Sequence, residues 1–375
     1  MSDRPAVVLA LPPRLTDDLL PADLWARLRA AADVDPTVNL QVSPDPAALA
    51  RAEVLLTGWG SPVLDAEFLA RAPALRAVVH AAGSVKGHVT PAVYAAGIAV
   101  TSAADANARP VAEYTLAALI LSAKRAFGAS HALRTSHDGH RHAPGAASGL
   151  TGGVVGVVGA SRIGRLVIDM LADYDVEVLV ADPYADPAEF GGVRGAAGGA
   201  GVPGVAGTGG ATRDTSGCGC GCRCGGPGGT RPAGRGRATL VDLDTLCRRA
   251  DIVTVHAPDL PETRHLLDAR RLGLLRDGAV VINTARGALV DTAALTRECA
   301  VGRLDAVLDV TDPEPLPLDH PLLRLPNVLV TPHIAGVRGR ELRLLGGYAV
   351  AEIERFAAGL PLRGAVRFGD LARIA

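Results

Sequence analysis

The sequence predicts an α/β protein built from two doubly wound parallel sheets with a cleft between them. Short apolar strands alternate with helical segments along most of the chain, which is typical of a parallel sheet covered by helices on both faces. The alternation stops near residue 104 and begins again at Gly153, so we expect two units. A length of 375 residues is enough for two domains of ordinary size.

Composition favours a folded protein that acts on a small molecule. Apolar residues make up 48% and charged residues 21% of the chain, which is enough for a sizeable core. The net charge of −1 gives no attraction to nucleic acid or to an anionic membrane, and 3% aromatic residues argue against base stacking. We therefore expect neither nucleic acid nor a membrane as a partner.

The N-terminal residues and the cysteines indicate the compartment. The opening Met1-Ser2-Asp3-Arg4-Pro5 lacks the basic region and apolar stretch of a signal peptide, and no run approaches the roughly 18 apolar residues that span a bilayer. Four of the six cysteines crowd into residues 218–224, unlike the spread framework of a disulfide-rich secreted fold. A cytoplasmic protein is expected.

The first unit contains four apolar segments of strand length. We expect strands at residues 6–10, 53–57, 76–79 and 98–101. We expect helices around residues 15–31, 46–51, 62–71 and 90–96.

A long helix should follow the first unit. Pro110 suits its first turn, and residues 111–126 are apolar on most faces. Such a helix is buried between domains or against a second subunit. We expect residues 128–150 to form a loop.

The second unit repeats the pattern from residue 153 onward. We expect strands at residues 154–158, 177–181, 252–255, 279–282, 305–309 and 327–330. We expect helices at residues 162–173, 242–250, 291–301 and 339–358. The last helix should return to the first unit, so that the chain crosses between the units twice.

A glycine-rich segment interrupts this unit at residues 191–238, where 19 of 48 residues are glycine. It cannot bury enough apolar surface to fold, so a flexible insertion is expected. Its Cys-x-Cys repeat at residues 218–224 has tighter spacing than structural zinc sites use. The histidines at 131, 137, 140 and 142 are a second, weaker metal candidate. We predict no metal.

A dinucleotide-binding loop follows the first strand of the second unit. Gly159 and Gly164 flank a turn that opens a helix, and Asp182 ends the next strand 18 residues further on. This arrangement sets phosphates at a helix N-terminus and an acid at the ribose hydroxyls. Ser161 stands where a second glycine is usual, and its hydroxyl meets a phosphate oxygen or distorts the loop. No Arg directly follows Asp182, so NAD is preferred over NADP unless a distant Arg reaches the site.

A cation, an acid and an imidazole lie after three strands of the second unit. They are Arg286, Glu314 and His333. Guanidinium grips a carboxylate in a planar fork, and imidazole exchanges a proton near neutral pH, with a raised pKa beside a carboxylate. Each residue alone is ordinary, but the ends of parallel strands meet at the edge of the sheet where ligands bind. This trio suits the reduction of a carbonyl beside a carboxylate.

Several motifs together resemble the D-isomer-specific 2-hydroxyacid dehydrogenases. They occur over residues 107–113, 159–164, 256–263, 283–291, 309–315 and 332–336 and cover nearly the whole chain outside the insertion. The resemblance implies that Arg286 binds substrate, Glu314 partners His333, and His333 is the acid/base. It also implies a homodimer joined through the cofactor domain.

The resemblance further implies the groups that contact cofactor and substrate. The cofactor-binding residues are Gly159, Ser161, Arg162, Ile163, Gly164, Asp182, His256, Pro258, Thr263, Thr284, Ala285, Asp309, His333 and Gly336, with Asp309 beside the nicotinamide. The substrate-binding residues are Gly58, Trp59, Ala82, Gly83, Ser84 and Arg286. Lys86 and His88 are atypical of the substrate loop. They recognise an extra substrate group or are exposed loop charges.

The motifs and the resemblance together predict the domain organisation and the reaction. Residues 1–104, completed by 335–375, form the substrate domain, and residues 105–334 form the NAD-binding domain, both of Rossmann-like or flavodoxin-like type. The expected reaction interconverts a 2-oxo acid and a (D)-2-hydroxy acid by hydride transfer with NAD. An NAD-binding corepressor or sensor of the same fold is the alternative. Formate dehydrogenases usually carry Gln in place of the acid, so Glu314 disfavours them.

Overall fold

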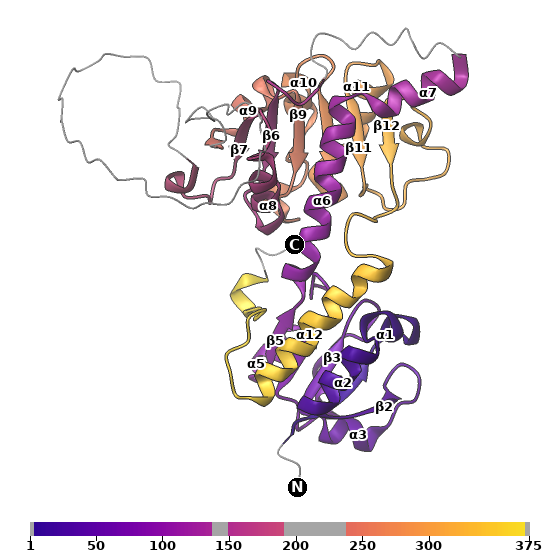
Figure 1. The fold of residues 1–375 in the computed structure, drawn as a ribbon, viewed down its shortest axis with the longest axis vertical. Coiled ribbons are helices and arrows are strands. Elements are labelled where there is room, and N and C mark those ends of the chain that lie inside the picture. Colours follow the sequence, from indigo (N-terminus) through magenta and orange to yellow (C-terminus); the bar gives the residue numbers. More distant parts are fainter. Residues whose placement is uncertain (1–3, 137–148, 191–237, 372–375) are drawn as a thin grey trace, which may run out of the picture.

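The computed structural model describes residues 4–136, 149–190 and 238–371. Figure 1 shows two α/β units, one above the other, joined by the long helix α6 (Ala104–Ala123). The first unit is the sheet of β1 to β5 with its helices. The second unit is the sheet of β6 to β12 with its helices, and α6 precedes this sheet in the chain.

The first unit holds a five-stranded parallel sheet in the order β2-β1-β3-β4-β5. Its strands are β1 (Ala6–Ala10), β2 (Asp33–Asn39), β3 (Val54–Thr57), β4 (Ala77–His80) and β5 (Ala99–Ser102). An order of 2-1-3-4-5 is that of flavodoxin-like folds. The sheet therefore has the predicted class.

Helices cover both faces of this sheet because successive residues of its buried strands point to opposite faces. Val7 and Leu9 pack with α1 (Pro13–Leu19), α2 (Ala22–Ala31) and the C-terminal α12 (Leu342–Ala357). Val8 and Ala10 pack with α3 (Pro46–Arg51), α4 (Ala66–Ala70) and α5 (Pro91–Ala95). The predicted return of the last helix onto the first unit is confirmed, as Figure 1 shows in yellow.

The second unit holds a seven-stranded parallel sheet in the order β12-β11-β10-β9-β6-β7-β8. Its strands are β6 (Val154–Val158), β7 (Glu177–Ala181), β8 (Thr239–Leu240), β9 (Ile252–Val255), β10 (Val280–Asn283), β11 (Asp305–Leu308) and β12 (Val328–Val330). The order reverses between β6 and β9, which is the switch point of a Rossmann fold. Ligands of such sheets bind outside the carboxyl ends of the strands.

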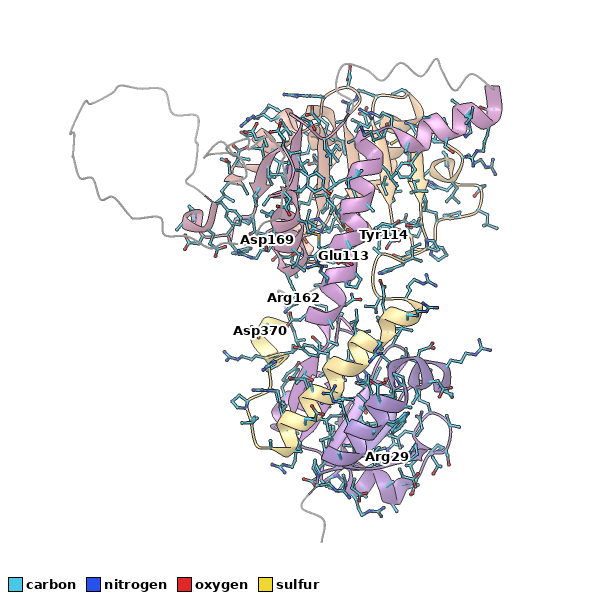
Figure 2. The ribbon with its side chains drawn as sticks, viewed as in Figure 1. Arg29, Glu113, Tyr114, Arg162, Asp169 and Asp370 are labelled. Carbon is cyan, nitrogen blue, oxygen red and sulfur yellow. The ribbon has the colours of Figure 1, made fainter. Side chains whose placement is uncertain are left out.

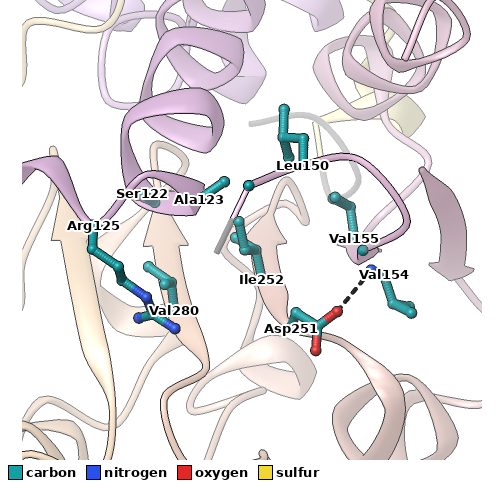
Figure 3. A pocket seen from close by; sticks show the side chains of 11 residues that line it. Ser122, Ala123, Arg125, Leu150, Val154, Val155, Asp251, Ile252 and Val280 are labelled. Atoms are coloured by element: carbon teal, nitrogen blue, oxygen red, sulfur yellow. Dashed lines mark hydrogen bonds between the residues drawn. The ribbon is translucent and has the colours of Figure 1, made fainter. Parts of the chain in front are cut away.

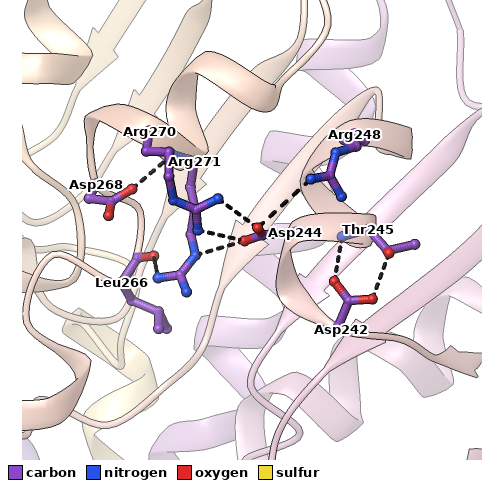
Figure 4. Close-up of polar contacts among 8 residues, drawn as sticks. All are labelled: Asp242, Asp244, Thr245, Arg248, Leu266, Asp268, Arg270 and Arg271. Atoms are coloured by element: carbon purple, nitrogen blue, oxygen red, sulfur yellow. Dashed lines mark hydrogen bonds and ion pairs between the residues drawn. The ribbon is translucent and has the colours of Figure 1, made fainter.

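Helices also cover both faces of the second sheet. α6 and α8 (Arg162–Leu171) pack on one face. α9 (Leu243–Arg249), α10 (Ala269–Leu274) and α11 (Thr292–Ala300) pack on the other. Figure 4 shows the carboxylate of Asp244 joining α9 to Arg270 and Arg271 of α10, at 2.6 Å and 3.2 Å. The hydrogen bond from Arg270 holds the pKa of that carboxyl below its usual value.

Three predictions about elements are wrong, and the strands β2 and β8 and the helix α10 were not predicted. The helix expected at 15–31 is two helices, because Pro21 lacks an N–H and turns Leu20 away from helical geometry. The strand β2 was not predicted, since it is an exposed edge strand containing Pro36.

The long helix begins at Ala104, so Pro110 lies inside it rather than in its first turn. Burial of the helix against the second sheet offsets the backbone hydrogen bond that the proline removes. Residues 126–136, expected partly as loop, form the helix α7 (Ala126–Ser136) beside β12.

The predicted insertion at 191–238 falls outside the described residues except for Ala238, which is buried and leads into β8. Within residues 4–136, 149–190 and 238–371, no helix combines the length and apolarity needed to cross a bilayer.

Candidate active site

The register of the second sheet brings the trio to one edge. Asn283 of β10 is aligned with Leu308 of β11, and Leu308 with Val330 of β12. Arg286 lies three residues after Asn283, and His333 lies three residues after Val330. Two strand spacings, about 10 Å, separate their strands, and the loop that carries Glu314 leaves from the strand between them.

His333 and Glu314 are paired directly. The Nδ1 atom of His333 lies 2.6 Å from Oε1 of Glu314, and their side chains are 52% and 41% exposed. An ion pair this exposed adds little to stability. Its short distance and its access to solvent instead suit a proton-transferring group whose tautomer is set by its partner.

The backbone of His333 is held in an unusual conformation. Its φ of 53° lies in the left-handed region, which costs on the order of 1 kcal/mol for a residue with a side chain. Its N–H donates to the carbonyl oxygens of Asp309 and Thr331, at 2.9 Å and 3.0 Å. Such strain is maintained where surrounding bonds fix it, and it is common at functional sites.

Asp309 organises the segment around His333. The side chain is buried, and its carboxylate accepts hydrogen bonds from the Thr331 hydroxyl at 2.7 Å and from the N–H groups of Ile334 and Ala335 at 2.8 Å each. These three donors engage both carboxylate oxygens. The resemblance placed Asp309 beside the nicotinamide; in the structure its side chain binds the chain that carries His333.

Arg286 projects from a tight turn after β10. The Asn283 side chain donates to the Arg286 carbonyl at 2.8 Å, and Nη1 of Arg286 donates to the Ala285 carbonyl at 2.7 Å. Gly287 must lack a side chain, because a Cβ there would lie 2.0 Å from the Thr311 backbone. This close approach packs the Arg286 turn against the loop that leads to Glu314.

The glycine loop fits a dinucleotide. Gly159 has a φ of 95°, and a Cβ at that position would lie 2.7 Å from the backbone nitrogen of Ala257. A Cβ on Gly164 would lie 2.1 Å from the Gly159 carbonyl oxygen. Ser161 has an extended backbone and caps α8 through its hydroxyl, 3.4 Å from the Gly164 nitrogen, so the serine does not distort the loop.

Two charged residues flank this loop. Asp182, after β7, accepts the N–H groups of Ala160 at 2.7 Å and Tyr184 at 2.8 Å, which fixes its carboxylate beside the loop. Arg162, in the first turn of α8, forms an ion pair with Asp105 of α6. Ile163 is half-buried and packs against the core of this unit. The Gly loop, the N-terminus of α8 and Asp182 therefore have the places that a dinucleotide requires.

The loop after β9 borders the same edge. His256 is buried with Nε2 3.0 Å from the Thr254 hydroxyl, and burial lowers its pKa to about 3. Its Nδ1 has no hydrogen-bond partner among the described residues. The Thr263 hydroxyl donates to the Pro258 carbonyl at 2.7 Å and closes this loop.

The predicted substrate residues follow strands of the first unit. Gly58 and Trp59 follow β3, and Trp59 is 44% exposed. Ala82, Gly83 and Ser84 follow β4, with Ala82 fully buried.

The two atypical residues of that loop differ. Lys86 reaches the second unit, with Nζ 3.5 Å from the Asp259 carbonyl oxygen, and its pKa is lowered by burial and by the charge of Arg286. His88 is buried and stacks on His80, with ring centroids 5.0 Å apart. The interpretation of His88 as an exposed loop charge is therefore wrong.

Asn107 was not predicted as a site residue, although it begins one of the motifs that carry the family resemblance. Its Oδ1 accepts the N–H of Val337 at 3.1 Å, and a Cβ on Gly336 would lie 2.9 Å from that oxygen. A Cβ on Gly83 would lie 3.3 Å from its Nδ2. Asn107 thus lies where α6, the substrate loop and the returning chain meet.

Other features lie away from this edge. Figure 3 shows a depression at the amino ends of β6, β9 and β10, bordered by Ser122, Arg125 and Asp251, at the opposite end of the sheet from the trio. Among the described residues, no group of three or more His, Cys, Asp or Glu side chains is placed to hold a metal ion. Of the metal candidates noted in the sequence, only His131 is described.

Comparison with known proteins identifies the family. The chain belongs to the D-isomer specific 2-hydroxyacid dehydrogenases, since residues 117–197 and 204–335 match the NAD binding domain of that family. This match confirms NAD as the predicted cofactor.

Individual relatives support this assignment. A D-3-phosphoglycerate dehydrogenase of Mycobacterium tuberculosis is 34% identical over 86% of this chain and 52% of that protein. A glyoxylate reductase of Thermofilum pendens is 30% identical over 72% of this chain and 69% of that protein. The chain spans about half the length of the D-3-phosphoglycerate dehydrogenases that it matches.

A solved structure agrees with the fold. The NAD complex of a D-isomer specific 2-hydroxyacid dehydrogenase from Lactobacillus delbrueckii matches with a TM-score of 0.72. The match covers 96% of this chain and 99% of that chain at 18% identity.

Proposed function

We propose that this chain is an NAD-dependent oxidoreductase that interconverts a 2-oxo acid and a (D)-2-hydroxy acid. One observation carries the proposal: the paired His333 and Glu314 lie on the same sheet edge as Arg286 and the dinucleotide loop. Family membership supports it.

The roles of the trio follow from their chemistry. Arg286 binds the substrate carboxylate and stabilises the charge that develops on the carbonyl oxygen. Protonated His333 donates its proton to that oxygen, while Glu314 orients the imidazole and stabilises its charge. When bound, the reduced nicotinamide supplies the hydride. In the reverse direction His333 accepts the hydroxyl proton.

The remaining assignments belong to the same proposal. Residues 105–334 hold NAD, with Gly159, Ser161 and Arg162 at the pyrophosphate and Asp182 at the adenosine ribose, which favours NAD over NADP. Residues 1–104 and 335–375 supply the loops that select the substrate between the two units. We expect a cytoplasmic homodimer joined through the NAD-binding domain.

The test is an NADH-oxidation assay of the full chain with glyoxylate, pyruvate, hydroxypyruvate and phosphohydroxypyruvate, repeated with the His333→Ala variant. The variant should lose turnover by at least about 100-fold, because the proton donor is gone. It should keep NADH affinity within about threefold, measured by NADH fluorescence, since the dinucleotide loop is untouched.

Two results would overturn the proposal. Turnover that survives in His333→Ala would remove His333 from the reaction. Absence of turnover with every acid, together with tight NADH binding by the wild-type chain, would favour the alternative of an NAD-binding corepressor or sensor.

A further inference from the structure

Two neighbouring residues of α6 hold the strand ends that lead to the site. The Tyr114 hydroxyl lies 2.8 Å from the Thr331 hydroxyl, two residues before His333. The Thr115 hydroxyl lies 2.9 Å from the Thr284 hydroxyl, two residues before Arg286. Figure 2 labels Tyr114 on α6, where that helix lies against the second unit.

The single hydroxyl proton of Thr331 decides the direction of its hydrogen bond with Tyr114. A threonine hydroxyl has one proton to donate, and Thr331 donates it to the carboxylate of Asp309 at 2.7 Å. Tyr114 must therefore be the donor to Thr331. Burial, and secondarily the charge of Asp309, raise the pKa of Tyr114, so its phenol keeps the proton that it donates. The chain Tyr114, Thr331, Asp309 then ends on the N–H groups of Ile334 and Ala335, the two residues directly after His333.

The second contact has an equally fixed direction. Thr115 donates its proton to the Val111 carbonyl within α6, at 2.8 Å, so Thr284 is the donor to Thr115. Both threonines are buried, where an unpaired hydroxyl costs about 1–3 kcal/mol. Thr284 also lies between Asn283 and Ala285. The Asn283 side chain accepts the N–H of Ala285 and donates to the carbonyl of Arg286, which stabilises the turn of Arg286.

We infer that Tyr114 and Thr115 are positioning residues that fix the spacing between His333 and Arg286. Successive residues of a helix point about 100° apart, so one helix reaches two strand ends about 10 Å apart. The inference rests on the proposed function for its kinetic consequences. A 2-oxo acid needs its carboxylate at Arg286 and its carbonyl oxygen at His333 together, so this spacing matters to the reaction.

The test uses four variants of the full chain. Tyr114→Phe and Thr115→Val each remove one hydroxyl, Thr115→Ser retains it, and Ser122→Ala is the control. Ser122 is also buried on α6, and its hydroxyl has no partner among the described residues.

Kinetics with the acid of the panel that the wild-type chain reduces fastest should separate the two positions. Tyr114→Phe should lower kcat about tenfold with little change in KM, because it loosens the proton donor. Thr115→Val should raise KM about tenfold with a smaller change in kcat, because it loosens the carboxylate site. Thr115→Ser and Ser122→Ala should match the wild type within about twofold.

Amide hydrogen exchange reports the same positions without turnover. Tyr114→Phe should speed exchange at Ile334 and Ala335, and Thr115→Val should speed it at Ala285, whereas Ser122→Ala should speed neither. Wild-type exchange at these amides in both variants would overturn the inference. The inference would also be overturned if kcat fell and KM rose to the same extent in both variants and in Ser122→Ala. Absence of turnover in the wild type would refute the proposed function alone, since exchange would still decide this inference.

Discussion

At the scale of single residues, Glu314 can affect His333 in two ways: through its negative charge and through the geometry of its hydrogen bond. A substitution can separate these two effects. The Glu314 carboxylate lies 2.6 Å from Nδ1 of the His333 imidazole. The side-chain amide of a glutamine could occupy the same space without the negative charge. An amide oxygen would still orient the ring. It would no longer stabilise the protonated form that gives up the proton.

Glu314→Gln should therefore lower kcat by about 10- to 100-fold while KM for the 2-oxo acid changes little. Steady-state kinetics with the best acid of the panel measure both constants. Glu113→Gln is the matched control, because Glu113 pairs with Arg109 on the exposed side of α6. Unchanged kcat in Glu314→Gln would show that the carboxylate charge has no part in the reaction.

Residues such as Tyr114 and Thr115 mark the limit of sequence reasoning at this scale. The trio could be predicted, because each member ends or follows an apolar strand and such ends meet at one edge. The partners of Tyr114 and Thr115 lie 217 and 169 residues away in the chain. A tyrosine and a threonine on an apolar helix do not indicate those partners until the fold is known.

At the scale of elements, the turn from β6 into α8 depends on glycine. A Cβ on Gly164 would lie 2.1 Å from the Gly159 carbonyl oxygen, so the helix must move away from the loop to accept it. That movement would displace the N–H groups that an anion meets at the helix N-terminus.

Gly164→Ala should therefore raise the Kd for NADH about tenfold or more, measured by fluorescence titration. Gly273→Ala is the control, because nothing lies within 4 Å of the added Cβ in α10. NADH binding by Gly164→Ala that equals the wild type would contradict the placement of the cofactor at this loop.

Elements were predictable where burial imposed a pattern on the sequence. The strands of both sheet centres, such as β3, β4, β9 and β10, are fully buried and appear as continuous apolar runs. The edge strand β2 faces solvent and carries Asp33, Asp35 and Pro36, so no apolar run marks it. The start of α6 was misplaced because Pro110 resembles a helix start, whereas packing on the second sheet stabilises the helix around it.

At the scale of the whole molecule, each unit buries a neutral histidine after a central strand or at its end. Burial lowers the pKa of His80 in the first unit and of His256 in the second to about 3, from an ordinary value of 6.5. Between these values the unfolded chain binds a proton that the folded chain does not. Stability therefore falls as pH falls through this window.

Each histidine should lower the free energy of unfolding by on the order of 1 kcal/mol per pH unit between pH 6.5 and pH 5, where ordinary carboxyl groups stay ionised. Urea unfolding at both pH values measures the effect. His80→Gln should reduce the slope, and His131→Gln on α7 should leave it unchanged. Equal stability at pH 6.5 and pH 5 would contradict the burial of these imidazoles in neutral form.

The central claim is that the two units together reduce a 2-oxo acid stereospecifically. The most direct measurement follows NADH loss with pyruvate, hydroxypyruvate and phosphohydroxypyruvate, whose reduction products are chiral, and determines the configuration of each product by chiral chromatography. One (D)-2-hydroxy acid should form for each NADH consumed. An (L) or racemic product, or no NADH consumed with any acid, would contradict it.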